Sequence, residues 1–72
     1  MTDADNPRKS GEFIQSLDRG LAVIRAFSNE QDMLSLADVA KITGLSRASV
    51  RRALLTLEVL GYVGSRRNRF SA

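Results

Sequence analysis

The segment GLSRASVRRALLTLEVLGYV, residues 44–63, combines a regular apolar pattern with three arginines close to its start. At about 100° per residue, its apolar positions fall on one stripe of a helix. That stripe consists of Val50, Ala53, Leu54, Leu57 and Leu60. The opposite face and its flanks carry basic and small residues: Arg47, Ala48, Ser49, Arg51 and Arg52. The pattern predicts a helix over about 47–60 with one buried face and one basic face.

A shorter helix is predicted immediately before this basic helix. Ser35 is a favourable N-cap residue, and Asp38 follows it at the spacing of a capping box. The apolar residues that follow predict a helix over about 36–43, which Gly44 ends because glycine readily adopts the left-handed conformation. Ser46 then caps the basic helix. Two helices joined by a glycine-containing turn of about three residues predict a helix-turn-helix.

A third helix is predicted upstream, over about 17–27, because four apolar residues recur at helical spacing. They are Leu17, Leu21, Ile24 and Phe27, of which the first three are expected to face the core. Ser16 is expected to be the N-cap. Gly20 weakens such a helix by about 1 kcal/mol relative to alanine, so close packing against another element is expected there. Residues 1–12 are polar and lack this pattern, which predicts a mobile tail.

The residues after Gly61 predict a β-hairpin, because aromatic and β-branched residues stand on both sides of a polar turn. Three arginines crowd this turn, namely Arg66, Arg67 and Arg69. Like charges at such spacing repel one another unless an anion such as a phosphate lies nearby. A hairpin that follows a helix-turn-helix is the wing of a winged helix. Since the chain ends at Ala72, the second strand of this wing is expected to be incomplete, as in a piece of a longer protein.

The predicted fold class is therefore mainly α, a three-helix winged helix-turn-helix with a C-terminal β-hairpin wing that is truncated. Its domain is expected over residues 13–72, with the helix-turn-helix at about 35–54. No run approaches the ~20 apolar residues of a membrane span, and the polar start lacks the apolar centre of a signal peptide. The expected location is the cytoplasm, without membrane contact.

The composition argues against catalysis and against a metal or other cofactor. The chain has neither Cys nor His, so disulfides, thiolate ligands and imidazole ligands are excluded. Its carboxylates are scattered over separate predicted helices, and no glycine-rich phosphate loop is present. No nucleophile or acid–base pair can be identified, which indicates a protein that is not an enzyme.

Charge is distributed unevenly along the chain. Residues 1–40 carry four basic and seven acidic side chains, whereas residues 41–72 carry seven basic side chains and one acidic, Glu58. A basic half joined to an acidic half is typical of proteins that bind nucleic acid, and arginine can hold guanine or phosphate through two hydrogen bonds. The sequence therefore predicts double-stranded DNA as the partner, with the basic helix in the major groove and the wing on the backbone or minor groove. The predicted DNA-binding residues are Ser35, Ser46, Arg47, Ala48, Ser49, Arg51, Arg52, Arg66, Arg67 and Arg69.

Two alternatives stay open on the residues alone. The arginines of the basic helix would also suit a helix face that is simply hydrated. Leu55 and Val59 lie on the same outward face further along that helix, where a protein partner or another part of the chain would cover them. A winged-helix module for protein–protein interaction is the second function class, because a fold alone does not assign a function.

Two runs of the chain resemble the N-terminal winged-helix domain of the IclR family of bacterial transcriptional regulators. They are FIQSLDRGLAVIRAF, residues 13–27, and LSLADVAKITGLSRASVRRALLTLEVLGYV, residues 34–63, and the basic wing follows them. The most specific part is the pairing of QSLDR, residues 15–19, with TGLS, residues 43–46. Within the family, the chain looks most like regulators of aromatic-acid breakdown by the protocatechuate and β-ketoadipate routes.

The resemblance implies further properties that these residues alone do not predict. Members of the family carry a larger C-terminal domain that senses a small-molecule effector, and this domain is expected to lie outside these residues. They act as dimers or tetramers on palindromic, inverted-repeat operators. The region of the first helix helps to pair two DNA-binding domains, and the matching positions here are Phe13, Ile14, Leu17 and Leu21.

Overall fold

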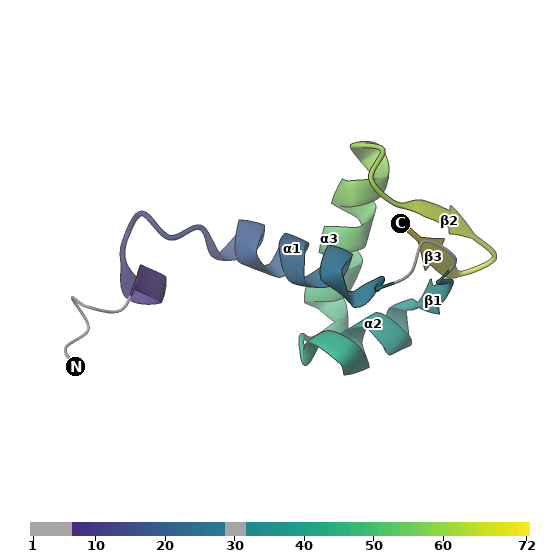
Figure 1. Cartoon of the computed structure of the whole chain (residues 1–72), viewed down its shortest axis with the longest axis horizontal. Coiled ribbons are helices and arrows are strands. Elements are labelled where there is room, and N and C mark those ends of the chain that lie inside the picture. Colours follow the sequence, from purple (N-terminus) through teal and green to yellow (C-terminus); the bar gives the residue numbers. More distant parts are fainter. Residues whose placement is uncertain (1–6, 29–31) are drawn as a thin grey trace.

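Three α-helices and a small antiparallel sheet make up the computed structural model, which describes residues 7–28 and 32–72 (Figure 1). A 3-10 helix, η2 (Pro7–Lys9), precedes them. The α-helices are α1 (Gln15–Ala26), α2 (Leu36–Thr43) and α3 (Arg47–Val59), and the strands are β1 (Leu34–Ser35), β2 (Gly64–Arg66) and β3 (Arg69–Ser71). The mainly α winged helix-turn-helix predicted from the sequence is confirmed.

The core lies where the three helices meet the base of the sheet. α1 packs across α3, and α2 packs against both helices (Figure 1). The buried side chains are Val23, Ala26, Phe27, Val39, Val50, Leu54, Leu57 and Val63. Leu54, Val50, Val39 and Val23 are completely buried, so the predicted stripe of the basic helix forms the centre of the core.

Two parts of the predicted core are wrong. Leu60 was expected in the stripe of α3, but its side chain is 62% exposed because α3 ends at Val59 and Gly61, at φ +86°, turns the chain away. Leu17 and Leu21 were expected to face the core as well. They are 58% and 42% exposed, because both line an open groove between α1 and α3, whereas Ile24 is half-buried against the core.

The start of α1 also differs from the prediction. The helix begins at Gln15, and its N-cap position is Ile14, which offers no side-chain hydrogen bond. Ser16 is therefore the second residue of the helix rather than its cap. Gly20 was expected to allow close packing, but an added Cβ there would meet nothing within 4 Å. The glycine instead lines an open groove between α1 and α3.

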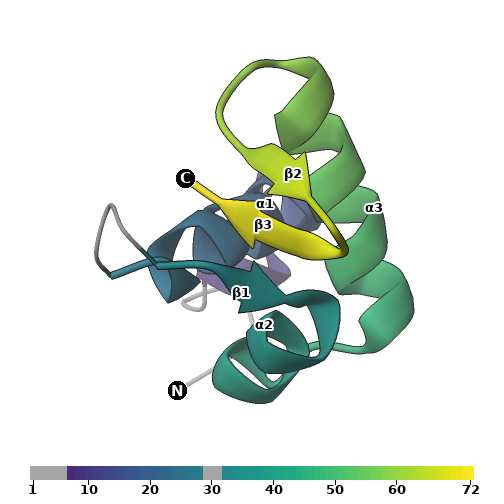
Figure 2. The same ribbon diagram turned by 90° about the vertical axis from the view of Figure 1, so that its right-hand side faces the viewer.

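The sheet has the strand order β1-β3-β2, with both pairs antiparallel (Figure 2). β3 pairs along its whole length with β2, from Arg66 opposite Arg69 to Gly64 opposite Ser71. β1 adds the pairs Leu34 with Phe70 and Ser35 with Arg69. The sequence predicted the hairpin but not β1, because a strand of two residues has no visible alternation.

The predicted tail, residues 1–12, is described only in part. Its residues 1–6 lie outside the described residues, as do residues 29–31 of the connector between α1 and β1. The described part contains η2, from which Arg8 forms an ion pair of 3.5 Å with Asp18 of α1. The Arg8 guanidinium also lies 5.7 Å from the centre of the Phe13 ring. This part of the tail therefore contacts the beginning of α1.

Candidate nucleic-acid interface

The turn between α2 and α3 is held by backbone and side-chain hydrogen bonds. Gly44 adopts the left-handed conformation at φ +74°, and its N–H donates to the Ala40 carbonyl over 2.9 Å. The Thr43 hydroxyl donates to the Val39 carbonyl at 2.8 Å and accepts from the Leu45 N–H at 3.2 Å. Because both sides of the turn are bonded, the direction in which α3 leaves α2 is well defined.

The first turn of α3 carries the predicted serines. The Ser46 hydroxyl accepts from the Ser49 N–H at 3.1 Å and donates to the Ser49 hydroxyl at 3.0 Å, which confirms Ser46 as the N-cap. Ser46 is exposed and Ser49 is half-buried. The Ser49 hydroxyl keeps a proton to donate, so this helix start presents a hydrogen-bond donor beside the positive end of the helix dipole.

The outward face of α3 is basic and open. Arg47, Ala48, Arg51 and Arg52 are all exposed, whereas Val50 and Leu54 on the opposite side are buried. None of these three arginines forms an ion pair within the described part of the chain. Ala48 lets the backbone come close to a ligand, and the guanidinium groups around it are available to a polyanion.

Ser35 lies at the start of α2, half-buried and next to the wing. The predicted capping box is present: the Asp38 N–H donates to the Ser35 hydroxyl at 3.1 Å, and the Ser35 N–H donates to the Asp38 carboxylate at 3.0 Å. The hydrogen bond that the Asp38 carboxylate accepts from the Ser35 backbone N–H lowers the pKa of Asp38 below its ordinary value of 3.8, and the Ser35 side chain lowers it further. The charges of Arg69 and Lys41 make smaller contributions. Asp38 is therefore charged at neutral pH and stabilises the start of α2.

The wing presents three exposed arginines at one tip. Arg66 and Arg69 stand opposite each other across the hairpin, an arrangement in which like charges repel. Arg67 and Asn68 between them have φ +51° and +66°, as a two-residue turn of the I′ type requires. The Ser65 hydroxyl donates to the Glu58 carboxylate, which ties the wing to the second half of α3.

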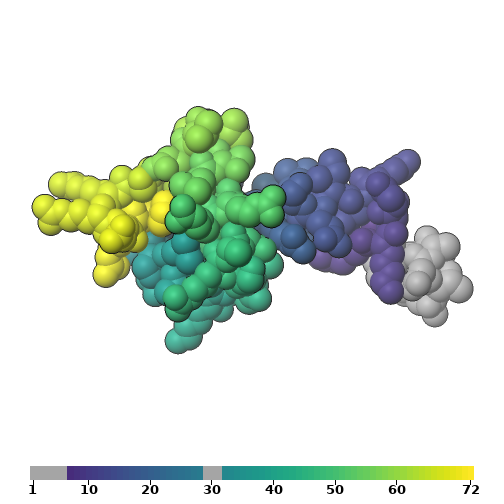
Figure 3. Space-filling view, turned by 180° about the vertical axis from the view of Figure 1, so that it is seen from behind, coloured from purple at the N-terminus to yellow at the C-terminus, as the bar shows by residue number. Residues whose placement is uncertain are grey.

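Figure 3 shows the face of the molecule on which α3 lies in front, with the wing on one side and α1 on the other. The predicted residues of α3 and the wing therefore belong to neighbouring parts of one surface. Two findings concern only the described part of the chain: it contains no cluster of acidic side chains that could hold a metal ion, and no helix there has the length and apolar character needed to cross a membrane.

Comparison with known proteins agrees with this arrangement. The model of the IclR helix-turn-helix domain matches residues 16–67, which include α1 from its second residue, the helix-turn-helix and β2 of the wing. The chain belongs to the IclR family. Its helix-turn-helix is of the type found in transcriptional regulators, which bind DNA. The expected family resemblance is confirmed.

Two curated relatives regulate pca genes. The chain is 48% identical over 54 residues to the Pca regulon regulatory protein of Pseudomonas putida, and 39% identical over 54 residues to the Pca operon regulatory protein of Acinetobacter baylyi. Each match covers 75% of the chain and 19% of the relative. The chain thus spans about a fifth of the length of these IclR-type regulators.

A solved structure supports the same fold. The crystal structure of a candidate transcriptional regulator from Rhodococcus sp. RHA1 superimposes with a TM-score of 0.76 at 51% identity. The match covers 82% of the chain and 24% of that structure. A domain of similar fold is therefore part of a longer chain in that protein.

Proposed function

We propose that the chain is the DNA-reading domain of a ligand-responsive transcriptional regulator and binds double-stranded DNA sequence-specifically. α3 would enter the major groove with Arg47, Ala48, Ser49, Arg51 and Arg52, and Ser46 would lie at its start. The wing would bring Arg66, Arg67 and Arg69 to the backbone or the minor groove, and Ser35 would donate its hydroxyl to a phosphate beside them. The observation that carries the proposal is the exposed basic face of α3, which is centred near Ala48 and faces away from the completely buried Val50 and Leu54.

The geometry of this surface supports the assignment. A major groove about 12 Å wide admits one helix, and helices of this type contact base edges with their N-terminal residues. The capped first turns of α3 carry the exposed arginines, and the positive end of the helix dipole lies there too. The wing supplies a second cationic group on the same side of the molecule as α3.

The test is a fluorescence-anisotropy titration of the chain against a mixed-sequence duplex and a panel of inverted-repeat duplexes at low and moderate salt. We expect salt-dependent binding with preference for one inverted repeat. Arg51→Ala should lower the affinity for that duplex by about 1–3 kcal/mol and relax its preference, since an arginine that reads a base is lost. Arg25→Ala, which removes an exposed arginine from the last turn of α1, is the control. Unchanged affinity of Arg51→Ala would contradict the role given to α3.

We further propose that two copies pair through the beginning of α1 on an inverted repeat. Ile14, Leu17 and Leu21 are exposed at 60%, 58% and 42%, and Phe13 is half-buried beside them. Apolar side chains grouped in this way are typical of an interaction surface. Sedimentation of the chain with and without the preferred duplex should show pairing, and Leu17→Ser should weaken it without changing the contacts of α3.

The names of the relatives support a target gene set. We propose that the full-length regulator controls genes of aromatic-acid breakdown, as the Pca regulators do, and that its effector binds outside these residues. Inverted repeats upstream of such genes should bind the chain more tightly than the mixed-sequence duplex. Equal affinities would contradict this assignment while leaving DNA binding intact.

A second function class rests on one observation, the exposure of Leu55 and Val59 on α3, of which Val59 is 86% exposed. In that case the outward face of α3 would bind a protein rather than DNA. A protein complex insensitive to salt, together with no duplex binding at low salt, would favour this alternative.

A further inference from the structure

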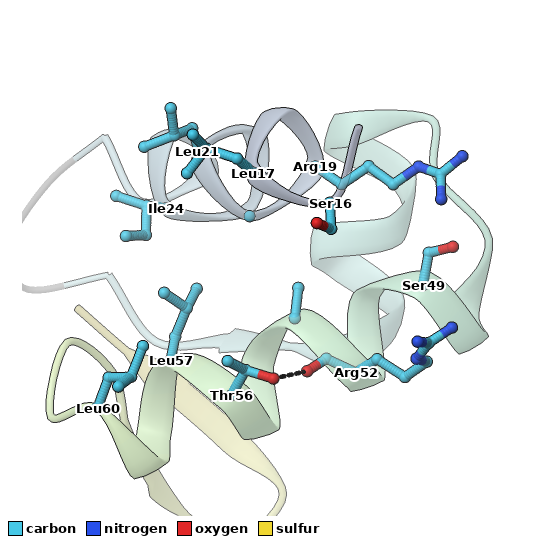
Figure 4. A pocket seen from close by; sticks show the side chains of 12 residues that line it. Ser16, Leu17, Arg19, Leu21, Ile24, Ser49, Arg52, Thr56, Leu57 and Leu60 are labelled. Carbon is cyan, nitrogen blue, oxygen red and sulfur yellow. Dashed lines mark hydrogen bonds between the residues drawn. The ribbon is translucent and has the colours of Figure 1, made fainter. Parts of the chain in front are cut away.

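A groove of about 410 Å³ separates α1 from α3, and its two ends differ in chemistry (Figure 4). Leucines and Ile24 line one end. Four polar side chains gather at the other, two from each helix: Ser16 and Arg19 of α1, and Ser49 and Arg52 of α3. No local sequence pattern connects Arg19 with Arg52, because their common position at this groove depends on how α1 crosses α3.

The polar end is suited to an anion. Two guanidinium groups and two hydroxyls are hydrogen-bond donors, and no carboxylate is among the described residues that line the groove. The Arg19 guanidinium has one long hydrogen bond of 3.4 Å to the Gln15 side chain, and Arg52 has no ion pair in the described part of the chain. Two cations that come from different helices and line the same end of one groove repel each other unless a negative group lies between them. A phosphate group matches the paired donors of arginine.

The polar end of the groove lies on one particular side of α3, and this position indicates which kind of anion it would bind. At about 100° per residue, Arg52 and Ser49 lie on the flank of α3 that faces α1, whereas Arg51 and Glu58 lie on the other flank. Glu58 is hydrogen-bonded to Ser65 of the wing, so that other flank faces the wing. Figure 3 shows α3 between the wing and α1 in this way. A helix in the major groove has one sugar–phosphate backbone on each side, and the wing can reach only one of them.

We propose that Arg19 and Arg52, assisted by Ser16 and Ser49, form a site for one backbone phosphate of the DNA strand on the α1 side of α3. Arg52 then anchors the domain, Arg51 reads bases, and α1 contributes directly to binding. The proposal rests on the DNA binding proposed above and adds a contact from a helix outside the helix-turn-helix. The wing then contacts the sugar–phosphate backbone on one side of the major groove, and the Arg19–Arg52 site contacts the backbone on the other side.

The test compares Arg19→Ala, Arg52→Ala and the double variant with Arg25→Ala, using anisotropy titrations of the mixed-sequence duplex and of the preferred inverted repeat. Each single variant should lose about tenfold in affinity, as expected for one charge-assisted hydrogen bond. The loss should be equal for both duplexes, because phosphate contacts carry no sequence information. Arg25→Ala should bind like the wild type, and Arg19→Lys should recover part of the affinity because the charge remains. Thermal unfolding of each variant checks that the fold is unchanged.

The double variant shows whether the two arginines share a phosphate. If Arg19 and Arg52 share one phosphate, the double variant loses less affinity than the product of the two single losses. The slope of log K against log salt concentration then falls in magnitude by about 0.9, as expected for one phosphate contact. Independent losses with a slope change of about 1.8 would mean two separate phosphates and overturn the shared site. If Arg19→Ala binds like Arg25→Ala while the wild type still shows salt-dependent binding, this inference fails alone. If the wild type binds no duplex at low salt, the DNA-binding proposal fails.

Discussion

The helix-turn-helix unit, α2 to α3, and helix α1 differ in their N-terminal capping and in how much of their apolar face is buried. Both helices of the unit have serine N-caps, and α3 buries Val50, Leu54 and Leu57. α1 has no side-chain cap, and its first two turns leave Leu17 and Leu21 exposed. The same kind of apolar spacing thus serves two purposes. In α3 it builds the core, and in α1 it leaves two leucines exposed along the groove between α1 and α3.

The largest expected effect distinguishes buried from exposed leucines. Leu54→Ala should lower the free energy of unfolding by about 2–5 kcal/mol, since Leu54 is completely buried and a cavity remains. Leu17→Ala should change it by less than about 0.5 kcal/mol at protein concentrations where the chain is monomeric. Urea unfolding of both variants measures the difference. A large loss in Leu17→Ala under these conditions would mean that α1 packs differently from the structure.

The next effect compares the two serines that the sequence predicted as caps. Ser35→Ala should cost about 1 kcal/mol, because it removes the hydroxyl that accepts from the Asp38 N–H. Ser16→Ala should be close to neutral, since Ser16 lies inside α1 and forms no cap. Thermal unfolding followed by circular dichroism can rank the two variants. Equal losses would show that α1 begins differently from the structure.

Alanine substitutions at two glycines should change the free energy of unfolding in opposite directions and by smaller amounts. Gly20→Ala should raise the free energy of unfolding by about 0.5–1 kcal/mol, because alanine favours the helix and its Cβ meets nothing within 4 Å. Gly44→Ala should lower it by about 1–2 kcal/mol, because Gly44 has φ +74°. The midpoints of denaturant unfolding, measured at low protein concentration, show whether each variant is more or less stable than the wild type. Loss of stability in Gly20→Ala would mean that the groove between α1 and α3 is narrower than described.

The smallest effect is the pH dependence of the capping box. Hydrogen bonds from Ser35 lower the pKa of Asp38 in the folded chain, so the charged carboxylate stabilises the fold above about pH 4. This contribution is lost as the pH falls through the lowered pKa. Asp38→Asn should therefore be less stable than the wild type at neutral pH, and the difference should shrink in acid. A difference that stays constant down to about pH 2 would contradict this role of the carboxylate.

The helix-turn-helix could be predicted closely because its signals are local. Ser35 with Asp38, Gly44 and Ser46 each act within a few residues of their position, and all four have the predicted roles. The opposite case is Leu17, where helical spacing cannot distinguish a core face from a partner face. The groove with Arg19 and Arg52 depends on the crossing of two helices, which no short stretch of sequence encodes. The contacts assigned to the DNA-binding residues stay predictions.

The hydrogen bond between Ser65 and Glu58 has a consequence for the thermodynamics of association. Together with the pairing of β3 to β1 and the half-buried Phe70, it holds the wing against α3 before any ligand is present. Conformational entropy of the wing is therefore lost when the chain folds rather than when it binds. An encounter with DNA then needs no ordering step in this part of the molecule. Ser65→Ala should thus leave the contacts in the bound state intact and make the entropy of binding less favourable.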